Sequence, residues 1–153
     1  LCKGYNTDHM GESFVKWYYQ EYWTATGEVF DIGIGTRNAL INIKNGTKAE
    51  FAGGRAEKDN GNGSLMRILP LVFAIKDLPI EERFYRTKQV SSITHGHIRA
   101  VMACFYYLEF AKQLIERKSK FDIYKDLQTT LPSFFKNSLS SFSSSANSAL
   151  ANL

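Results

Sequence analysis

The sequence has few cysteines and no long hydrophobic run. Its only two cysteines, Cys2 and Cys104, lie far apart and form no C-x-x-C pair. A disulfide scaffold is therefore not expected, and a reducing compartment fits better. No apolar run approaches the roughly 18 residues that span a bilayer. The opening segment, LCKGYN, lacks the charged and hydrophobic blocks of a signal peptide. We therefore predict a cytoplasmic protein without membrane association.

The sequence also lacks the charge pattern and the motifs of several functional classes. Its 19 Lys and Arg against 15 Asp and Glu leave a net charge of +4, spread along the chain. Without a basic stripe or a zinc-ligand spacing, nucleic-acid binding is not expected. No Gly-x-x-x-x-Gly-Lys-Ser/Thr loop or Gly-x-Ser-x-Gly turn is present, which argues against a P-loop and a serine-hydrolase elbow. His9, His95 and His97 lack a spacing that would form a metal site by themselves.

What the sequence does contain is apolar periodicity typical of helices. Apolar residues make up 44% of the chain and aromatic residues 14%, which is enough for a filled core in about one domain. A helix between about Gly96 and Arg117 is predicted by one apolar face, formed by Ile98, Val101, Met102, Phe105, Leu108, Ala111 and Ile115. No strand pattern competes, so we predict an all-α fold, a compact multi-helix bundle.

A first helix is predicted near the start of the chain, where apolar residues repeat every four positions at Met10, Phe14, Tyr18 and Tyr22. Thr7 or Asp8 is its expected cap. Trp17 and Trp23 are expected to widen its buried face.

Three prolines mark the predicted limits of later helices. Pro70 should kink or divide the apolar segment SLMRILPLVFAIKD, and Pro79 should begin a new helix. A last helix, capped by Asp122, is expected to be interrupted near Pro132. Beyond it, residues 138–153 are rich in serine and low in charge, and we predict a poorly ordered tail there.

The segment KDNGNGSLMR contains the strongest candidate binding loop. Gly61 and Gly63 permit close backbone approaches, and Asn60 and Asn62 tolerate left-handed conformations. Ser64 is predicted to cap the helix that follows, which would leave backbone N–H groups facing a polar or anionic ligand. The structural alternative for Asp59, which precedes the loop, is a surface turn with an Asx cap.

Three further side chains have both a functional and a structural interpretation. His95, in the segment THGH, is predicted to face a ligand where a loop meets the long helix. The alternative is that Thr94 caps that helix while His95 fills a polar niche. Arg67, on an otherwise apolar helix, must reach solvent or pair with an acid, and we predict that it holds the glycine loop in shape. Cys104 is predicted to be a small buried hydrophobe, and the alternative is a nucleophile.

Three segments together resemble the ADP-ribosylglycohydrolase family, whose all-α, magnesium-dependent enzymes include the dinitrogenase reductase-activating glycohydrolases. The segments are FVKWYYQEYWTATGEVFDIGIGTRNAL (Phe14 to Leu40), GNGSLMRILPL (Gly61 to Leu71) and ITHGHIRAVMACFYY (Ile93 to Tyr107). They occur in the family's order and at family-like separations. An unrelated helical domain that shares the loop by chance is therefore a remote alternative.

The resemblance implies a cleft for ADP-ribose or an ADP-ribosylated protein. By position, Asn60, Gly61, Asn62, Gly63 and His95 would bind the substrate, with Ser64 and Arg67 supporting the loop. Asp59 would be the residue with a direct chemical role, because an acid beside a glycosidic bond can orient or protonate the leaving group.

The family's two magnesium ions are held by acids from an early and a late motif, and neither motif is found in this sequence. No metal ligands are therefore predicted in this chain. We interpret residues 1–137 as the central part of such a domain, without its metal-bearing ends. The exposed apolar faces that this would leave predict self-association. The parent enzyme would hydrolyse the bond between ADP-ribose and an acceptor. The alternative is a metal-free, catalytically inactive ADP-ribose-binding or interaction domain.

Overall fold

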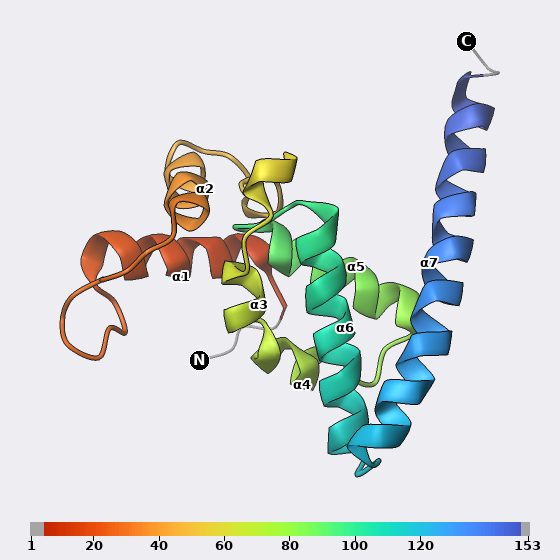
Figure 1. The fold of residues 1–153 in the computed structure, drawn as a ribbon. Helices are drawn as coiled ribbons and strands as arrows, with labels where there is room; N and C mark the ends of the chain where they lie inside the picture. The colour runs from red at the N-terminus through yellow and green to blue at the C-terminus, as the bar shows by residue number, and fades with distance from the viewer. Residues whose placement is uncertain (1–4, 151–153) are drawn as a thin grey trace. The chain divides into compact units, whose positions relative to one another are not determined.

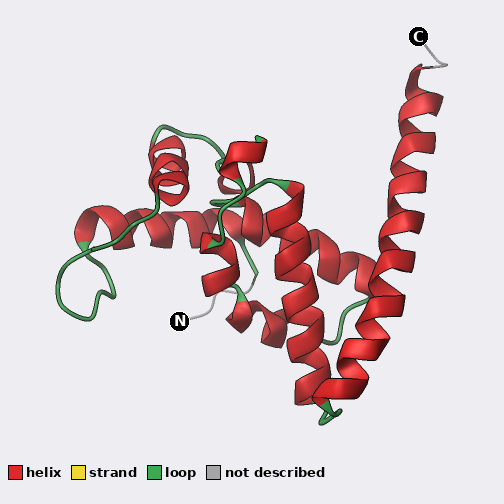
Figure 2. Cartoon of the chain, in the orientation of Figure 1, coloured by secondary structure: helices red, strands yellow, loops and turns green. Residues whose placement is uncertain are grey.

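The computed structural model describes the backbone of residues 5–150 and the side chains of residues 5–136. Within these limits the chain is all-α, as predicted, with seven α-helices, three short 3-10 helices and no strand (Figures 1 and 2). None of the described helices is long and apolar enough to cross a membrane. The chain divides into two compact units, Leu1–Leu108 and Glu109–Leu153.

The first unit begins with two helices that pack against each other, α1 (Thr7–Gln20) and α2 (Ile34–Lys44). The cap of α1 is Asn6, whose side-chain oxygen accepts a backbone N–H bond of 2.9 Å from the first turn. The prediction of Thr7 or Asp8 as the cap was therefore wrong. Asparagine performs the same function, because its side-chain oxygen reaches the free N–H groups of the first turn.

A loop joins α1 to α2 and carries Tyr22 and Trp23. The two rings stack with their centroids 4.5 Å apart, and the Trp23 side chain is 78% exposed. The prediction that Trp23 widens a buried helix face was wrong, because α1 ends at Gln20 with Glu21 in a left-handed conformation. The apolar repeat of period four continues in the sequence beyond the end of the helix.

The middle of the first unit consists of short helices. Two 3-10 helices, η1 (Ala49–Phe51) and η2 (Glu57–Asp59), precede the glycine loop. After it the chain forms α3 (Gly63–Arg67), the 3-10 helix η3 (Leu69–Leu71) and α4 (Val72–Ile75). Pro70 lies in η3 and divides the segment, as predicted, because proline cannot donate a backbone hydrogen bond.

Two longer helices complete the first unit. Helix α5 (Ile80–Ser92) begins directly after Pro79, as predicted. Helix α6 (Ile98–Ile115) contains the predicted apolar face, and its part up to Leu108 belongs to this unit. Phe105 is fully buried, with its ring edge-on to Phe84 at 5.2 Å. Cys104 is also fully buried, which confirms its prediction as a small core residue. Three residues predicted on the buried face are instead exposed by more than a third: Ile98, Met102 and Ile115.

The second unit contains the end of α6 and helix α7 (Lys120–Leu150). The cap of α7 is Ser119, because its hydroxyl accepts the N–H of Asp122 at 3.2 Å and donates to the Asp122 carboxylate at 2.6 Å. The prediction of Asp122 as the cap was wrong, since Asp122 lies inside the first turn. The predicted interruption near Pro132 was wrong, since α7 continues through it. The predicted poorly ordered tail stays a prediction, because its side chains and residues 151–153 lie outside the described residues.

Candidate functional site

The site is built on two segments that lie far apart in the sequence and meet through the backbone. The Gly53 N–H donates to the Ser92 carbonyl at 2.8 Å, and the Gly96 N–H donates to the Gly54 carbonyl at 2.9 Å. A β-carbon at Gly53 would stand 2.5 Å from the Ser92 oxygen. Only glycine fits there, because the neighbouring atoms are backbone atoms that cannot rotate away.

The imidazole of His95 packs against Gly61 and Gly63 of the glycine loop. His95 is only 5% exposed, and a β-carbon at Gly63 would stand 2.7 Å from its Cε1. At Gly61 the corresponding distance to Nε2 is 3.1 Å, and at Gly35 of α2 it is 3.5 Å. Neither Gly61 nor Gly63 has a positive φ. The structure therefore gives these two glycines a packing role: they leave space for the His95 ring. Their contact with a ligand stays a prediction.

A chain of hydrogen bonds connects Arg67 to His95. The Arg67 Nη2 donates to the Val90 carbonyl at 3.2 Å and to the Thr94 hydroxyl at 2.5 Å. The Thr94 oxygen lies 2.9 Å from Nδ1 of His95. Thr94 is thus not the cap of α6; the N–H of Arg99 near the start of that helix bonds to the His97 ring instead. Arg67 bonds to residues at and just after the end of α5, and its predicted support of the glycine loop stays a prediction.

The hydrogen bonds of this chain are compatible with either neutral tautomer of His95. The Thr94 oxygen accepts from Arg67 and lies 2.9 Å from Nδ1, and a hydroxyl can donate its own proton to the ring or accept a second bond from it. Nε2 is the ring nitrogen that faces Gly35 and Gly61. Burial lowers the pKa of His95, the charge of Arg67 lowers it further, and the Asp59 carboxylate acts in the opposite direction.

The lowered His95 pKa predicts a loss of stability in mild acid. The unfolded chain binds a proton at this histidine near pH 6.5, whereas the folded chain does so only at lower pH. The free energy of unfolding should therefore fall as the pH drops below about 6.5, by at most about 1.4 kcal/mol per pH unit. Urea unfolding at pH 7.5 and 5.5 measures this. His95→Gln should remove this share of the loss, and equal losses in both proteins would refute the assignment.

Asp59 and Ser64 make local contacts. The Asp59 carboxylate, at the end of η2, accepts the N–H of Ala56, three residues earlier, at 3.0 Å. This is the backward bond of a capping box and not the predicted Asx cap, and the chemical role of Asp59 stays a prediction. The prediction that Ser64 caps the next helix was wrong, because the cap position is Asn62 and makes no side-chain bond. Ser64 is instead fully buried, 3.0 Å from the Ser91 hydroxyl.

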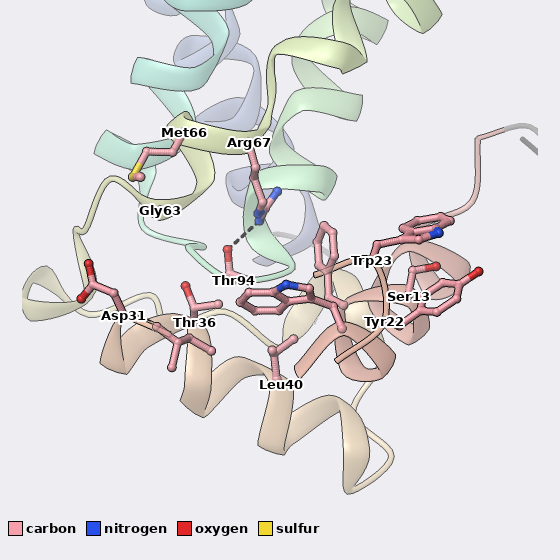
Figure 3. A pocket seen from close by; sticks show the side chains of 14 residues that line it. Ser13, Tyr22, Trp23, Asp31, Thr36, Leu40, Gly63, Met66, Arg67 and Thr94 are labelled. Carbon is pink, nitrogen blue, oxygen red and sulfur yellow. Dashed lines mark hydrogen bonds between the residues drawn. The ribbon is translucent and has the colours of Figure 1, made fainter. Parts of the chain in front are cut away.

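A cavity of about 470 Å³ opens beside the loop, within the first unit (Figure 3). Its walls include the aromatic residues Phe14, Trp17, Tyr22 and Trp23. Of the predicted site residues, only Gly63 and Arg67 line it. Asp59, Asn60, Gly61, Asn62 and His95 lie outside its wall, with Asn60, Gly61 and Asn62 exposed.

Sequence reasoning missed two parts of this site. Gly53 and Gly54 were not singled out, although two adjacent glycines in a long irregular segment are a signal of close backbone approach. Phe14 and Trp17 were interpreted as core residues, whereas both line the cavity.

The family model for ADP-ribosylglycohydrolase matches residues 1–153. The chain belongs to the ADP-ribosylglycohydrolase family. This membership confirms the predicted resemblance and supports a glycohydrolase-like function. No curated protein and no solved structure matches the chain. Among the residues that the structure describes, no three His, Cys, Asp or Glu side chains form a group that could hold a metal ion.

Proposed function

We propose that this chain supplies the ADP-ribose contacts of a glycohydrolase. The enzyme cleaves the bond between ADP-ribose and an acceptor, such as a protein side chain. Family membership supports the substrate class. The observation that carries the proposal is the position of the glycine loop: it packs on His95, which is more than 30 residues away in the sequence, and borders the cavity through Gly63.

The loop offers donors for a diphosphate. Gly61 and Asn62 are exposed, and within the described residues their backbone N–H groups make no hydrogen bond. Adjacent free N–H groups in a turn are suited to phosphate oxygens. Asn60, Asn62 and the Nε2 side of His95 would complete the contacts to ribose and phosphate. The Arg67–Thr94–His95 chain would keep the neutral histidine in one orientation.

We assign Asp59 the role of orienting or protonating the leaving group. Two substitutions separate this role from its bond to Ala56. Asp59→Asn keeps an oxygen for the Ala56 N–H, so ADP-ribose affinity should stay within about twofold, whereas Asp59→Ala should lower affinity about tenfold because the loop loses this bond. Calorimetric titration measures both.

A test of the chemical role of Asp59 requires a rate measurement in a form of the protein that carries the family's acidic motifs. Asp59→Asn should there slow ADP-ribose release at least about a hundredfold, the usual contribution of a general acid. An unchanged rate would remove Asp59 from the chemistry without affecting the binding proposal.

The described residues do not fit a magnesium site, because hard cations need several oxygen ligands and no group of three acids lies together. The second candidate, a metal-free ADP-ribose-binding or interaction domain, is motivated by the absence of both acidic motifs from the sequence. Incubation of the chain with an ADP-ribosylated protein tests it. Magnesium-dependent release of ADP-ribose by the chain alone would refute the second candidate.

A further inference from the structure

The loop between α1 and α2 contains backbone conformations that are rare for its residue types. It consists of residues 21–33 and carries three of the four non-glycine residues with positive φ in the described part of the chain: Glu21 (56°), Trp23 (62°) and Asp31 (49°). A residue with a β-carbon is strained in this region, and a bulky one such as tryptophan most of all. Such residues collect at clamps and moving segments, where the stored strain assists a change of conformation.

The middle of this loop is held only at its ends. Near α1 the N–H of Thr24 donates to the Glu21 carbonyl at 3.1 Å, and near α2 the N–H of Arg37 donates to the Gly33 carbonyl at 3.0 Å. Between these two bonds, residues 25–32 make no hydrogen bond and no ion pair within the described residues. A segment of this kind separates from its surroundings at little cost in free energy. The loop is also longer than the usual connection of about 2–8 residues between helices, which is typical of lids.

The loop supplies one wall of the cavity and α3 another. Trp23, Asp31 and Ile32 are loop residues on the wall, and Met66 lies on the wall from α3 (Figure 3). Both sides expose large apolar side chains: Met66 is 79% exposed, and Phe30, next to Asp31, is 76% exposed. Removal of apolar surface from water is favourable. A conformation in which Phe30 packs against Met66 therefore gains stability relative to the one described.

We infer that residues 25–32 are a lid of this cavity, which turns about Trp23 and Asp31 and closes when Phe30 packs against Met66. The described conformation is the open one, since both of these apolar side chains are more than two-thirds exposed. Closure returns the two hinge residues to negative φ, so the backbone strain of the open lid favours closing. The inference concerns access to the cavity, and it rests on the proposed function only where ADP-ribose is the probe.

Disulfide trapping tests closure without a ligand. Phe30→Cys with Met66→Cys should form an intramolecular disulfide at least about tenfold faster than Phe30→Cys with Phe73→Cys, because the two Cα atoms must approach within about 7 Å. Phe73 is the matched control: it is 68% exposed on α4 and does not line the cavity. The background for both pairs is Cys2→Ser, which leaves only the fully buried Cys104. Equal rates for the two pairs, or no disulfide in either, would refute the lid.

A glycine substitution tests whether Asp31 is a hinge. Asp31→Gly removes strain from the open lid, because glycine adopts a positive φ freely, and should slow the trapping about fivefold. Ala25→Gly is the matched control, since Ala25 is an exposed residue of the same loop without a positive φ. The control should trap within about twofold of the parent pair. Unchanged or faster trapping in Asp31→Gly would exclude this hinge.

ADP-ribose binding separates failure of the lid from failure of the proposed function. Stopped-flow mixing, followed by the fluorescence of Trp17 on the cavity wall, measures the association rate. The trapped disulfide form should bind at least about tenfold more slowly than the same chain after reduction, because the closed lid blocks entry. Equal rates in the two forms would show that residues 25–32 do not cover the cavity. If trapping succeeds and ADP-ribose does not bind the wild-type chain, the lid stands and the proposed function is wrong.

Discussion

Replacing Gly53 with alanine should lower the free energy of unfolding by about 3 kcal/mol, the largest effect expected from adding one methyl group to this chain. The new β-carbon would lie 2.5 Å from both the Ser92 oxygen and the Thr94 carbonyl carbon. Both are backbone atoms, so relief requires separating the two segments and stretching the 2.8 Å bond from the Gly53 N–H to Ser92. Urea unfolding followed by circular dichroism measures the change.

Gly33→Ala is the matched control for this substitution. Gly33 also lies in an irregular segment of the first unit, but a β-carbon there would meet nothing within 4 Å. Its φ of −62° suits alanine. The control should stay within about 0.5 kcal/mol of the wild type. Equal stability of the two variants would show that the Gly53 contact does not hold the loop.

Gly63→Ala should lower ADP-ribose affinity at least about tenfold and the free energy of unfolding by about 1–2 kcal/mol. The added β-carbon would stand 2.7 Å from Cε1 of His95 and 3.2 Å from the Thr36 hydroxyl. Because His95 is buried, its ring cannot simply turn into solvent. The ring must shift, which strains its contact with Thr94 and moves the loop. Calorimetric titration and urea unfolding give the two values.

Gly35→Ala places a methyl group toward the same imidazole at an ordinary contact distance, 3.5 Å from Nε2. Gly35 lies in α2, where alanine also favours the helix. This variant should keep both affinity and stability. If it weakens binding as much as Gly63→Ala does, distance to His95 does not explain the effect.

The sequence predicted the local features of the fold because local spacing determines them. The helical face around Val101 and Phe105, and the changes of structure at Pro70 and Pro79, follow from side-chain period and missing backbone donors. The errors arose where a local pattern allows more than one outcome. The four-residue repeat continues through Tyr22, for example, although α1 ends at Gln20.

The candidate site was predicted only in part, because its key contacts join distant segments. Both the glycine loop and His95 were singled out from the sequence, but nothing local shows that the ring occupies the space beside Gly61 and Gly63. The same limit explains Ser64, which looks like a cap in its own segment and is instead buried against Ser91. Arg67 was expected to reach solvent or to pair with an acid, whereas its partners are the Val90 carbonyl and the Thr94 hydroxyl, which come from a distant segment.

The most direct test of the central claim is calorimetric titration of the chain with ADP-ribose, with and without magnesium. The account predicts binding in both conditions with the same affinity, because the glycine loop, His95 and the cavity are formed by residues of this chain and no magnesium ligands lie among the described residues. Absence of binding in both conditions would contradict the account.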